Sequence, residues 1–367
     1  MRMLRLSAAV ALLAALWGAP ASAQVAPAPL LYGEELSQPT SLGDETLIGS
    51  VRTVGRRSRY SVLSLGAPGA APAPVFTADV TTGGDEQLAH AARLGYAASA
   101  THLAVVEDEE SVSPLDVVAA RLAVGFWRRV GPPALGSVLD CVADGALPDP
   151  PPYAVDGDRL AVLTQHCGSL RLLVHQAGTT RAFAVPPETS SGAIRLAGPY
   201  VAYRVFPLDR PARVVVARAD TGEEVFAVES RVSGFALAPD GRLYVSTTDH
   251  ALDRFSTCLD GQLHVASPAD PTLRRVPGAR PCDRIELDGD RVVFREPDGM
   301  LRALAPDGTT TTLARVYPDT DFDPGGGRVA VLMPSCAGGA LHSLALDGSS
   351  GLPELPGTCT ARLLSRT

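Results

Sequence analysis

The sequence predicts an all-β protein: a single β-propeller of about seven four-stranded blades, with six or eight blades as alternatives. Short segments with alternating apolar residues on both sides of a Gly turn recur at steps of 41, 41, 50 and 37 residues. The 35 Gly and 31 Pro residues among 367 are too many for a protein built on long helices. Apolar residues with a helical period are scarce, and only residues 85–93 could form one short helical turn.

The first residues have the pattern of a signal peptide. Arg2 and Arg5 precede an uncharged apolar run, and Ala21-Ser22-Ala23 is a small-residue cleavage site. The run is too short to span a bilayer. Cleavage near Ala23 predicts a secreted, extracellular or periplasmic protein with no membrane span. The expected organisation is a signal peptide over residues 1–23, a Pro-rich N-terminal linker over 24–40 and a β-propeller domain over 41–367.

The repeated segment predicts a β-hairpin, because Gly supplies the positive φ that a tight turn between two strands needs. The strong copies span residues 153–163, 194–203, 235–246, 285–294 and 322–332, and weaker copies begin near Leu42 and Leu94. A second turn follows about 20 residues later, at 219–222, 306–309 and 346–348. Two hairpin turns and four strands per unit are typical of a propeller blade. We expect N-terminal strands to join the last blade and close the ring.

Two stretches resemble a known family. Residues 235–247 (FALAPDGRLYVST) and 304–309 (LAPDGT) are similar to the repeats of TolB-type and WD-repeat-like β-propellers, in which such a turn precedes an outgoing strand. The resemblance covers roughly residues 153–348, and the Trp-Asp dipeptide of true WD repeats is absent. It implies a scaffolding or ligand-binding role more often than catalysis.

Six cysteines in an exported chain favour disulfides, and no Cys-x-x-Cys spacing of a zinc or redox site occurs. Neighbouring cysteines are separated by 26, 24 and 23 residues, which predicts the pairs Cys141–Cys167, Cys258–Cys282 and Cys336–Cys359. Fifteen pairings are formally possible for six cysteines, and reduced buried thiols are the alternative.

The chain contains neither Lys nor Asn. This composition excludes Lys-based covalent catalysis, P-loop nucleotide binding and N-glycosylation. The net charge of −8 argues against nucleic acid as a partner, because neutralising phosphates needs a basic surface.

The best candidate for a chemical site is the Asp-x-Asp-x-Asp spacing of Asp319, Asp321 and Asp323. It resembles the start of a calcium-binding loop, but Pro324 stands where Gly is needed and Ala330 where Glu is needed. We expect no cofactor, with calcium as the alternative. The main expectation is that Phe322 is buried at the start of a blade and that the three aspartates share one face of the strand.

Other polar clusters have ordinary structural explanations. Glu107–Glu110 is expected at a solvated hairpin tip, and His102 and His264 alternate with apolar neighbours as structural imidazoles do. Residues 126–129 (FWRR) could bind a ligand, but a half-buried outer strand covered by Arg stems is the main expectation.

These patterns favour a non-catalytic exported module that binds a protein or a polysaccharide, and we expect it to be a monomer. The first alternative is a propeller-fold enzyme of hydrolase, lactonase or quinoprotein type. The sequence contains neither a nucleophile motif nor a His pair at metal-ligand spacing that would support an enzyme. The second is a structural cell-surface spacer. We predict no catalytic and no cofactor-binding residues.

Overall fold

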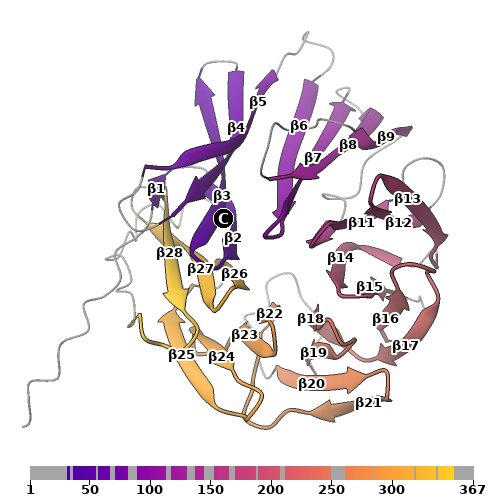
Figure 1. The fold of residues 1–367 in the computed structure, drawn as a ribbon, viewed down its shortest axis with the longest axis vertical. Helices are drawn as coiled ribbons and strands as arrows, with labels where there is room; N and C mark the ends of the chain where they lie inside the picture. The colour runs from indigo at the N-terminus through magenta and orange to yellow at the C-terminus, as the bar shows by residue number, and fades with distance from the viewer. Residues whose placement is uncertain are drawn as a thin grey trace, which may run out of the picture.

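The computed structural model describes residues 31–33, 36–54, 57–66, 71–81, 89–112, 117–129, 137–143, 153–164, 170–186, 189–206, 211–248, 261–282, 284–317, 320–335 and 338–350. These residues form 28 strands in seven four-stranded antiparallel sheets, and none of them is helical. The sheets surround a central axis as blades 1 to 7, with the first strand of each blade innermost (Figure 1). The predicted seven-bladed β-propeller is confirmed.

The first three blades span the N-terminal half of the ring. Blade 1 contains β2 (Leu36–Leu42), β3 (Glu45–Val54), β4 (Arg57–Leu65) and β5 (Ala73–Thr81). Blade 2 contains β6 (Ala89–Ala98), β7 (His102–Val112), β8 (Val117–Arg128) and β9 (Ser137–Ala143). Blade 3 contains β10 (Tyr153–Asp156), β11 (Arg159–Thr164), β12 (Arg171–Gln176) and β13 (Thr179–Ala184).

The next three blades repeat the same order. Blade 4 contains β14 (Thr189–Ala197), β15 (Tyr200–Val205), β16 (Arg213–Arg218) and β17 (Glu224–Glu229). Blade 5 contains β18 (Val232–Leu237), β19 (Leu243–Thr247), β20 (Gln262–Ser267) and β21 (Asp270–Arg275). Blade 6 contains β22 (Ile285–Asp288), β23 (Arg291–Arg295), β24 (Met300–Leu304) and β25 (Thr310–Arg315).

Blade 7 combines both ends of the described chain. It contains β26 (Asp321–Gly325), β27 (Arg328–Ser335), β28 (Gly338–Ala345) and, as its outermost strand, β1 (Leu31–Gly33). Strand β1 pairs antiparallel with β28, from Leu31 opposite Leu341 to Gly33 opposite Gly339. The expected closure of the ring by an N-terminal strand is confirmed. The propeller begins before the predicted boundary at residue 41, because residues of the expected linker 24–40 form β1 and most of β2.

The inner hairpins turn where the repeat predicts. In blade 3, Asp156 pairs with Arg159 across a two-residue loop, and in blade 6 Asp288 pairs with Arg291 in the same way. The loops begin at Gly157 (φ +59°) and Gly289 (φ +57°), a left-handed conformation that only glycine adopts readily. The Asp-Gly dipeptides therefore determine where the two innermost strands of these blades meet.

The hydrophobic core is divided among the interfaces between blades. Each of seven clusters of buried apolar side chains combines residues of two neighbouring blades. At the closing interface, Ile48 and Leu65 of blade 1 pack against Ala330 and Leu341 of blade 7. Because a single blade cannot bury both of its faces, stability depends on the complete ring.

Two local features differ from what the composition suggests. Residues 89–93, part of the one segment that could have formed a helical turn, belong to β6 and pair with β7. Glu107–Glu110 lies inside β7 rather than at a hairpin tip, with Glu107 opposite Leu94. In both places the cross-strand pairing of a long hairpin overrides the local composition. The turn of this hairpin lies at residues 99–101.

Cys282 is the one cysteine whose side chain the structure describes. It is buried, with 5% of its surface exposed, and it is disulfide-bonded. Cys141 lies in β9 opposite Leu122. Cys167, Cys258, Cys336 and Cys359 lie outside the described residues, so the three pairs remain predictions.

Non-reducing peptide mapping of the mature protein should recover the pairs Cys141–Cys167, Cys258–Cys282 and Cys336–Cys359. Each pair would close a loop of roughly 25 residues, worth about 3 kcal/mol in the chain-entropy treatment. The reduced sample serves as the control. A peptide joining Cys167 to Cys258 would refute pairing between neighbours.

Candidate functional site

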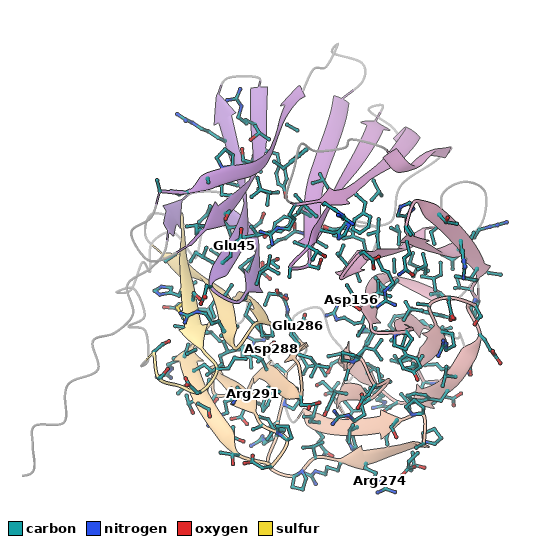
Figure 2. The ribbon with its side chains drawn as sticks, viewed as in Figure 1. Glu45, Asp156, Arg274, Glu286, Asp288 and Arg291 are labelled. Carbon is teal, nitrogen blue, oxygen red and sulfur yellow. The ribbon has the colours of Figure 1, made fainter. Side chains whose placement is uncertain are left out.

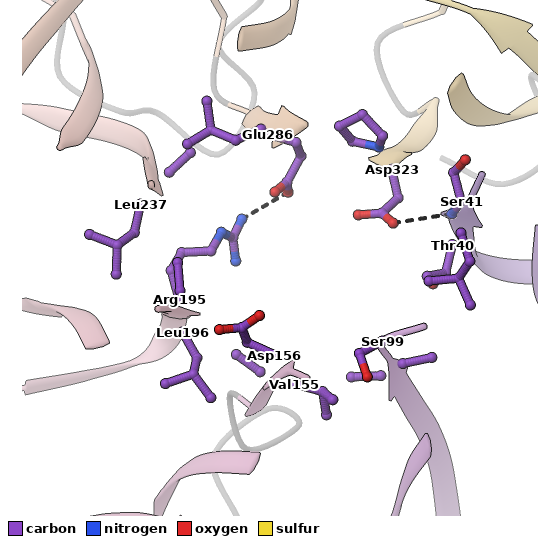
Figure 3. A pocket seen from close by; sticks show the side chains of 18 of the residues that line it. Thr40, Ser41, Ser99, Val155, Asp156, Arg195, Leu196, Leu237, Glu286 and Asp323 are labelled. Atoms are coloured by element: carbon purple, nitrogen blue, oxygen red, sulfur yellow. Dashed lines mark hydrogen bonds and ion pairs between the residues drawn. The ribbon is translucent and has the colours of Figure 1, made fainter. Parts of the chain in front are cut away.

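A cavity of about 770 Å³ lies on the axis of the ring, lined by the innermost strands of all seven blades (Figure 3). Its lining extends to the turns that join the first two strands of the blades, including Ser99, Pro239 and Gly289. The cavity thus adjoins the face of the ring that carries the inner turns. Asp156 and Glu286 lie at the inner edge of the ring, whereas Arg274 lies at its outer rim (Figure 2).

A chain of ion pairs crosses one side of the cavity. Arg195 of β14 donates to Glu286 of β22 at 2.8 Å (Figure 3). Arg284 donates to the same Glu286 oxygen at 3.1 Å. Arg284 also donates to Asp321 of β26 at 2.8 Å. The guanidinium groups bridge blades 4, 6 and 7, so these charges are compensated within the protein.

Asp323 lies beside this chain and has no ion pair among the described residues. Its carboxylate accepts the backbone N–H of Ser41 in blade 1 at 3.3 Å. Burial and the negative charge of Glu286 raise the pKa of Asp323 to about 7, against the opposing effect of Arg284. The cavity therefore contains a carboxyl group that changes charge near neutral pH.

On the side of blades 1 to 3, neutral groups of Gln38, Tyr96 and Tyr153 line the cavity together with the carboxylate of Asp156. Gln38 has a φ of +51°, which is uncommon for a residue other than glycine. Its amide oxygen accepts the N–H of Tyr96 at 3.1 Å, and its amide nitrogen donates to the Tyr153 hydroxyl at 3.3 Å. Burial raises the pKa of both tyrosines, so their hydroxyl groups stay neutral. Gly95 leaves space for this contact, because an added Cβ would lie 2.2 Å from the Tyr153 oxygen.

The inner turns are linked from blade to blade. Asp156 accepts the N–H of Gly198 at 2.8 Å, joining the turns of blades 3 and 4. Asp288 accepts the N–H groups of Gly326 and Gly327 at 3.0 and 2.6 Å, joining blades 6 and 7. These aspartates of the repeated Asp-Gly-Asp-Arg sequence therefore link neighbouring turns at the rim of the cavity. This structural role accounts for the two carboxylates without a catalytic one.

The structure brings part of the predicted aspartate cluster together. Asp321 and Asp323 occupy alternate positions of β26 around Phe322, which is 1% exposed, while Asp319 lies outside the described residues. Among the described residues, no group of three or more His, Cys, Asp or Glu side chains could hold a metal ion. Calcium binding by this segment remains a prediction.

The other sequence candidates lie outside the cavity lining. The His102 ring stacks on Phe126 at 5.0 Å, and its Nδ1 is 2.9 Å from the Thr101 hydroxyl. His264 in β20 lies 3.3 Å from the Thr247 hydroxyl. Phe126 belongs to β8, the third strand of its blade rather than the outermost one.

Sequence reasoning missed the arginines and the glutamate of the cavity. In the sequence, these residues (Arg195, Arg284 and Glu286) have apolar strand residues as neighbours. Exposed polar residues of any strand show the same pattern, so it does not mark a site. A usable signal was their place in the repeat, since Arg195 and Glu286 each directly follow an isoleucine that begins an inner-hairpin segment.

No family model and no curated protein matches the chain. Among solved structures, the β-propeller domain of the Trilobed protease from Pyrococcus furiosus is similar with a TM-score of 0.56 and 11% identity. That comparison covers 86% of this chain and 96% of the other. What the two share is the propeller fold.

Two peptidases are similar over part of their length. A structure from a study of two prolyl endopeptidases has a TM-score of 0.52 and 16% identity, covering 90% of this chain and 49% of the other. Pyrococcus horikoshii acylaminoacyl peptidase has a TM-score of 0.52 and 10% identity, covering 84% of this chain and 50% of the other. The chain thus spans about half the length of these two peptidases.

Within the described residues, no helix is long and apolar enough to cross a membrane.

Proposed function

We propose that this protein is a non-catalytic, exported binding module that takes a segment of a protein partner in its central cavity. The observation that carries the proposal is the cavity itself, which is lined by charged groups of both signs and by neutral hydroxyl and amide groups. Concave sites with a few placed polar groups are typical of ligand recognition. The signal-peptide pattern and the six cysteines support export.

With the exception of Asp323, which has no ion pair among the described residues, the acidic groups of the cavity wall formed by blades 6 and 7 are arranged for binding rather than catalysis. Glu286 is engaged by two guanidinium groups and Asp321 by one, so these carboxylates are held in place by ion pairs. A general base or nucleophile instead needs a free position facing the substrate. Ion-paired side chains at fixed positions suit recognition of a peptide segment with its own charged and polar groups.

The mixed lining favours a peptide over a polysaccharide. Sugar rings are commonly bound by stacking on open aromatic faces. The two tyrosines that line the cavity, Tyr96 and Tyr153, are largely buried, and their hydroxyl groups are hydrogen-bonded to Gln38. A polysaccharide is therefore the second candidate for the ligand.

Filling the cavity should abolish binding of the partner segment. Val155 lines the cavity from β10 and also packs against the core between blades 2 and 3, so Val155→Trp adds bulk at the cavity wall. Ala182→Trp on the exposed face of the outermost strand β13 is the matched control. The mature proteins would be tested against immobilised libraries of charged peptides and of polysaccharides, with melting temperatures confirming that both variants fold.

We expect peptides that bind the wild-type protein and the Ala182→Trp variant, and at least about tenfold weaker binding by Val155→Trp, a loss of about 1.4 kcal/mol. Binding of polysaccharides alone would favour the second candidate. Stoichiometric bound calcium, or turnover of a hydrolase or dehydrogenase substrate that Asp321→Ala abolishes, would overturn the non-catalytic proposal.

A further inference from the structure

Arg204 occupies an unusual position near the end of β15, the second strand of blade 4. Its guanidinium carbon lies 5.5 Å from the centre of the Phe206 ring and 5.7 Å from the centre of the Phe235 ring in blade 5. Two aromatic rings thus flank one cation at the interface between blades 4 and 5. Such contacts with the faces of rings offset only part of the cost of removing a cation from water.

Among the described residues, no carboxylate compensates this cation. The hydrogen bond of the Arg204 side chain is a long one, from Nη2 to the Ser233 carbonyl oxygen at 3.4 Å. Its Nε atom is buried with no hydrogen-bond partner among the described residues, as is that of Arg195. Buried charged groups are normally paired, because desolvation of an isolated ion is costly. Arg195, Arg284 and Arg302 show the usual arrangement, each with a glutamate within 3.1 Å.

A second arginine increases the positive charge at this interface. The guanidinium carbon of Arg195 lies 5.9 Å from the centre of the same Phe235 ring. Burial, together with the positive charge of Arg195, lowers the pKa of Arg204. Arg195 is compensated by Glu286, whereas no carboxylate of the described residues compensates Arg204. An anion beside Arg204 would relieve both the desolvation cost and the repulsion.

The surface next to Arg204 also has an apolar component. Phe206 is 44% exposed and is the one large hydrophobic side chain of this kind in the described part of the chain. It follows the end of β15, whose other end adjoins the turn at Gly198 next to the cavity. Because the strand runs away from that turn, Phe206 and Arg204 lie toward the opposite face of the ring.

We propose that Arg204 and the exposed ring of Phe206 form a second binding site, which takes a carboxylate of a protein ligand together with an adjoining apolar side chain. A guanidinium group is planar and presents its donors as a fork that matches the two oxygens of a carboxylate. Phe206 supplies the contact for the apolar neighbour. The site lies apart from the cavity entrance and does not depend on the function proposed for the cavity.

N-acetylphenylalanine is a suitable probe, because it combines a carboxylate with an aromatic ring. N-acetylphenylalaninamide is its neutral counterpart, and N-acetyl-glutamyl-phenylalaninamide carries its carboxylate on a side chain instead of the chain end. Dissociation constants would be measured by titration calorimetry on the full mature chain. The acids should bind and the neutral amide should not, and comparison of the two acids distinguishes a chain terminus from an acidic side chain.

Arg204→Met should weaken binding of the acids by at least about tenfold, and Arg204→Lys by less, since an ammonium keeps the charge but lacks the fork. Arg315→Met removes an exposed arginine from β25 and should leave binding unchanged. Without ligand, Arg204→Met should melt at a higher temperature than the wild-type protein, because it removes a charge that no carboxylate of the described residues compensates. Val155→Trp should bind the acids normally, which separates this site from the cavity.

Two results would overturn the proposal. Equal binding of N-acetylphenylalanine and its amide to the wild-type protein would show that Phe206 alone is responsible. Unchanged binding of the acids by Arg204→Met would remove Arg204 from the site. Because the first comparison uses the wild-type chain, it holds even if the methionine variant fails to fold.

Discussion

Gly325→Ala should lower the free energy of unfolding by about 3 kcal/mol or more, because the new methyl group would meet the backbone of another blade. An added Cβ at Gly325 would lie 2.1 Å from the Ser41 carbonyl oxygen and 3.1 Å from its carbonyl carbon. A backbone cannot move aside as the end of a flexible side chain can. The Gly325 carbonyl oxygen also accepts hydrogen bonds from the Ser41 hydroxyl at 2.9 Å and the Gly43 N–H at 3.2 Å. Relief of the clash would therefore disturb the contact that joins blade 7 to blade 1.

Denaturant unfolding of the two proteins would measure this effect. Gly66→Ala is the matched control, because an added Cβ there would meet no atom within 4 Å. We expect the control to stay within about 0.5 kcal/mol of the wild-type protein, as is usual for surface substitutions. Equal stabilities of the two variants would show that the inner strands of blades 1 and 7 are not in tight contact.

The architecture could be predicted from the sequence because its signals are local. An Asp-Gly turn between alternating apolar residues determines a hairpin without reference to the rest of the chain. The hairpins at residues 153–163 and 285–294 therefore lie where the repeat predicts. Repetition of the unit then indicates the ring, because one blade cannot bury its own faces.

The N-terminal boundary could not be predicted in the same way. Strand β1 has three residues, too few to show an alternating pattern. It is a strand because β28, about 300 residues away in the sequence, offers it a free edge. A Pro-rich composition before it favours an extended linker, and that preference is compatible with an edge strand as well.

The cavity was less predictable than the fold because its residues converge from different blades. Asp321 and Asp323 were found from their spacing within one strand. Arg284 and Glu286, which determine the charge around them, lie on a different blade. The contact between Ser41 and Asp323 spans 282 residues, so only the closed ring reveals it.

Between pH 5 and pH 8, the wild-type protein should lose about 2 to 3 kcal/mol of stability that the Asp323→Asn variant retains. The pKa of Asp323 is raised to about 7 in the folded protein, mainly by burial and then by Glu286. The folded state therefore binds this proton more tightly than the unfolded state, in which the carboxyl group has its ordinary pKa near 4. The contribution to stability is complete below that value and is lost as the pH rises through 7. Asparagine keeps an acceptor for the Ser41 N–H but cannot ionise.

Comparison of the two proteins isolates this group from others that titrate. Burial lowers the pKa of His175 and His264, which makes the fold more stable as the pH rises through the same range. This contribution is common to both proteins and cancels in the difference between their unfolding free energies.

Asp307 is a control carboxylate in an outer turn, where the Thr309 N–H lowers its pKa. Asp307→Asn should therefore differ from the wild-type protein by a constant amount between pH 5 and pH 8. If Asp323→Asn and the wild-type protein showed the same dependence on pH, Asp323 would be a hydrated carboxylate with an ordinary pKa. The cavity wall formed by blades 6, 7 and 1 would then be open to water.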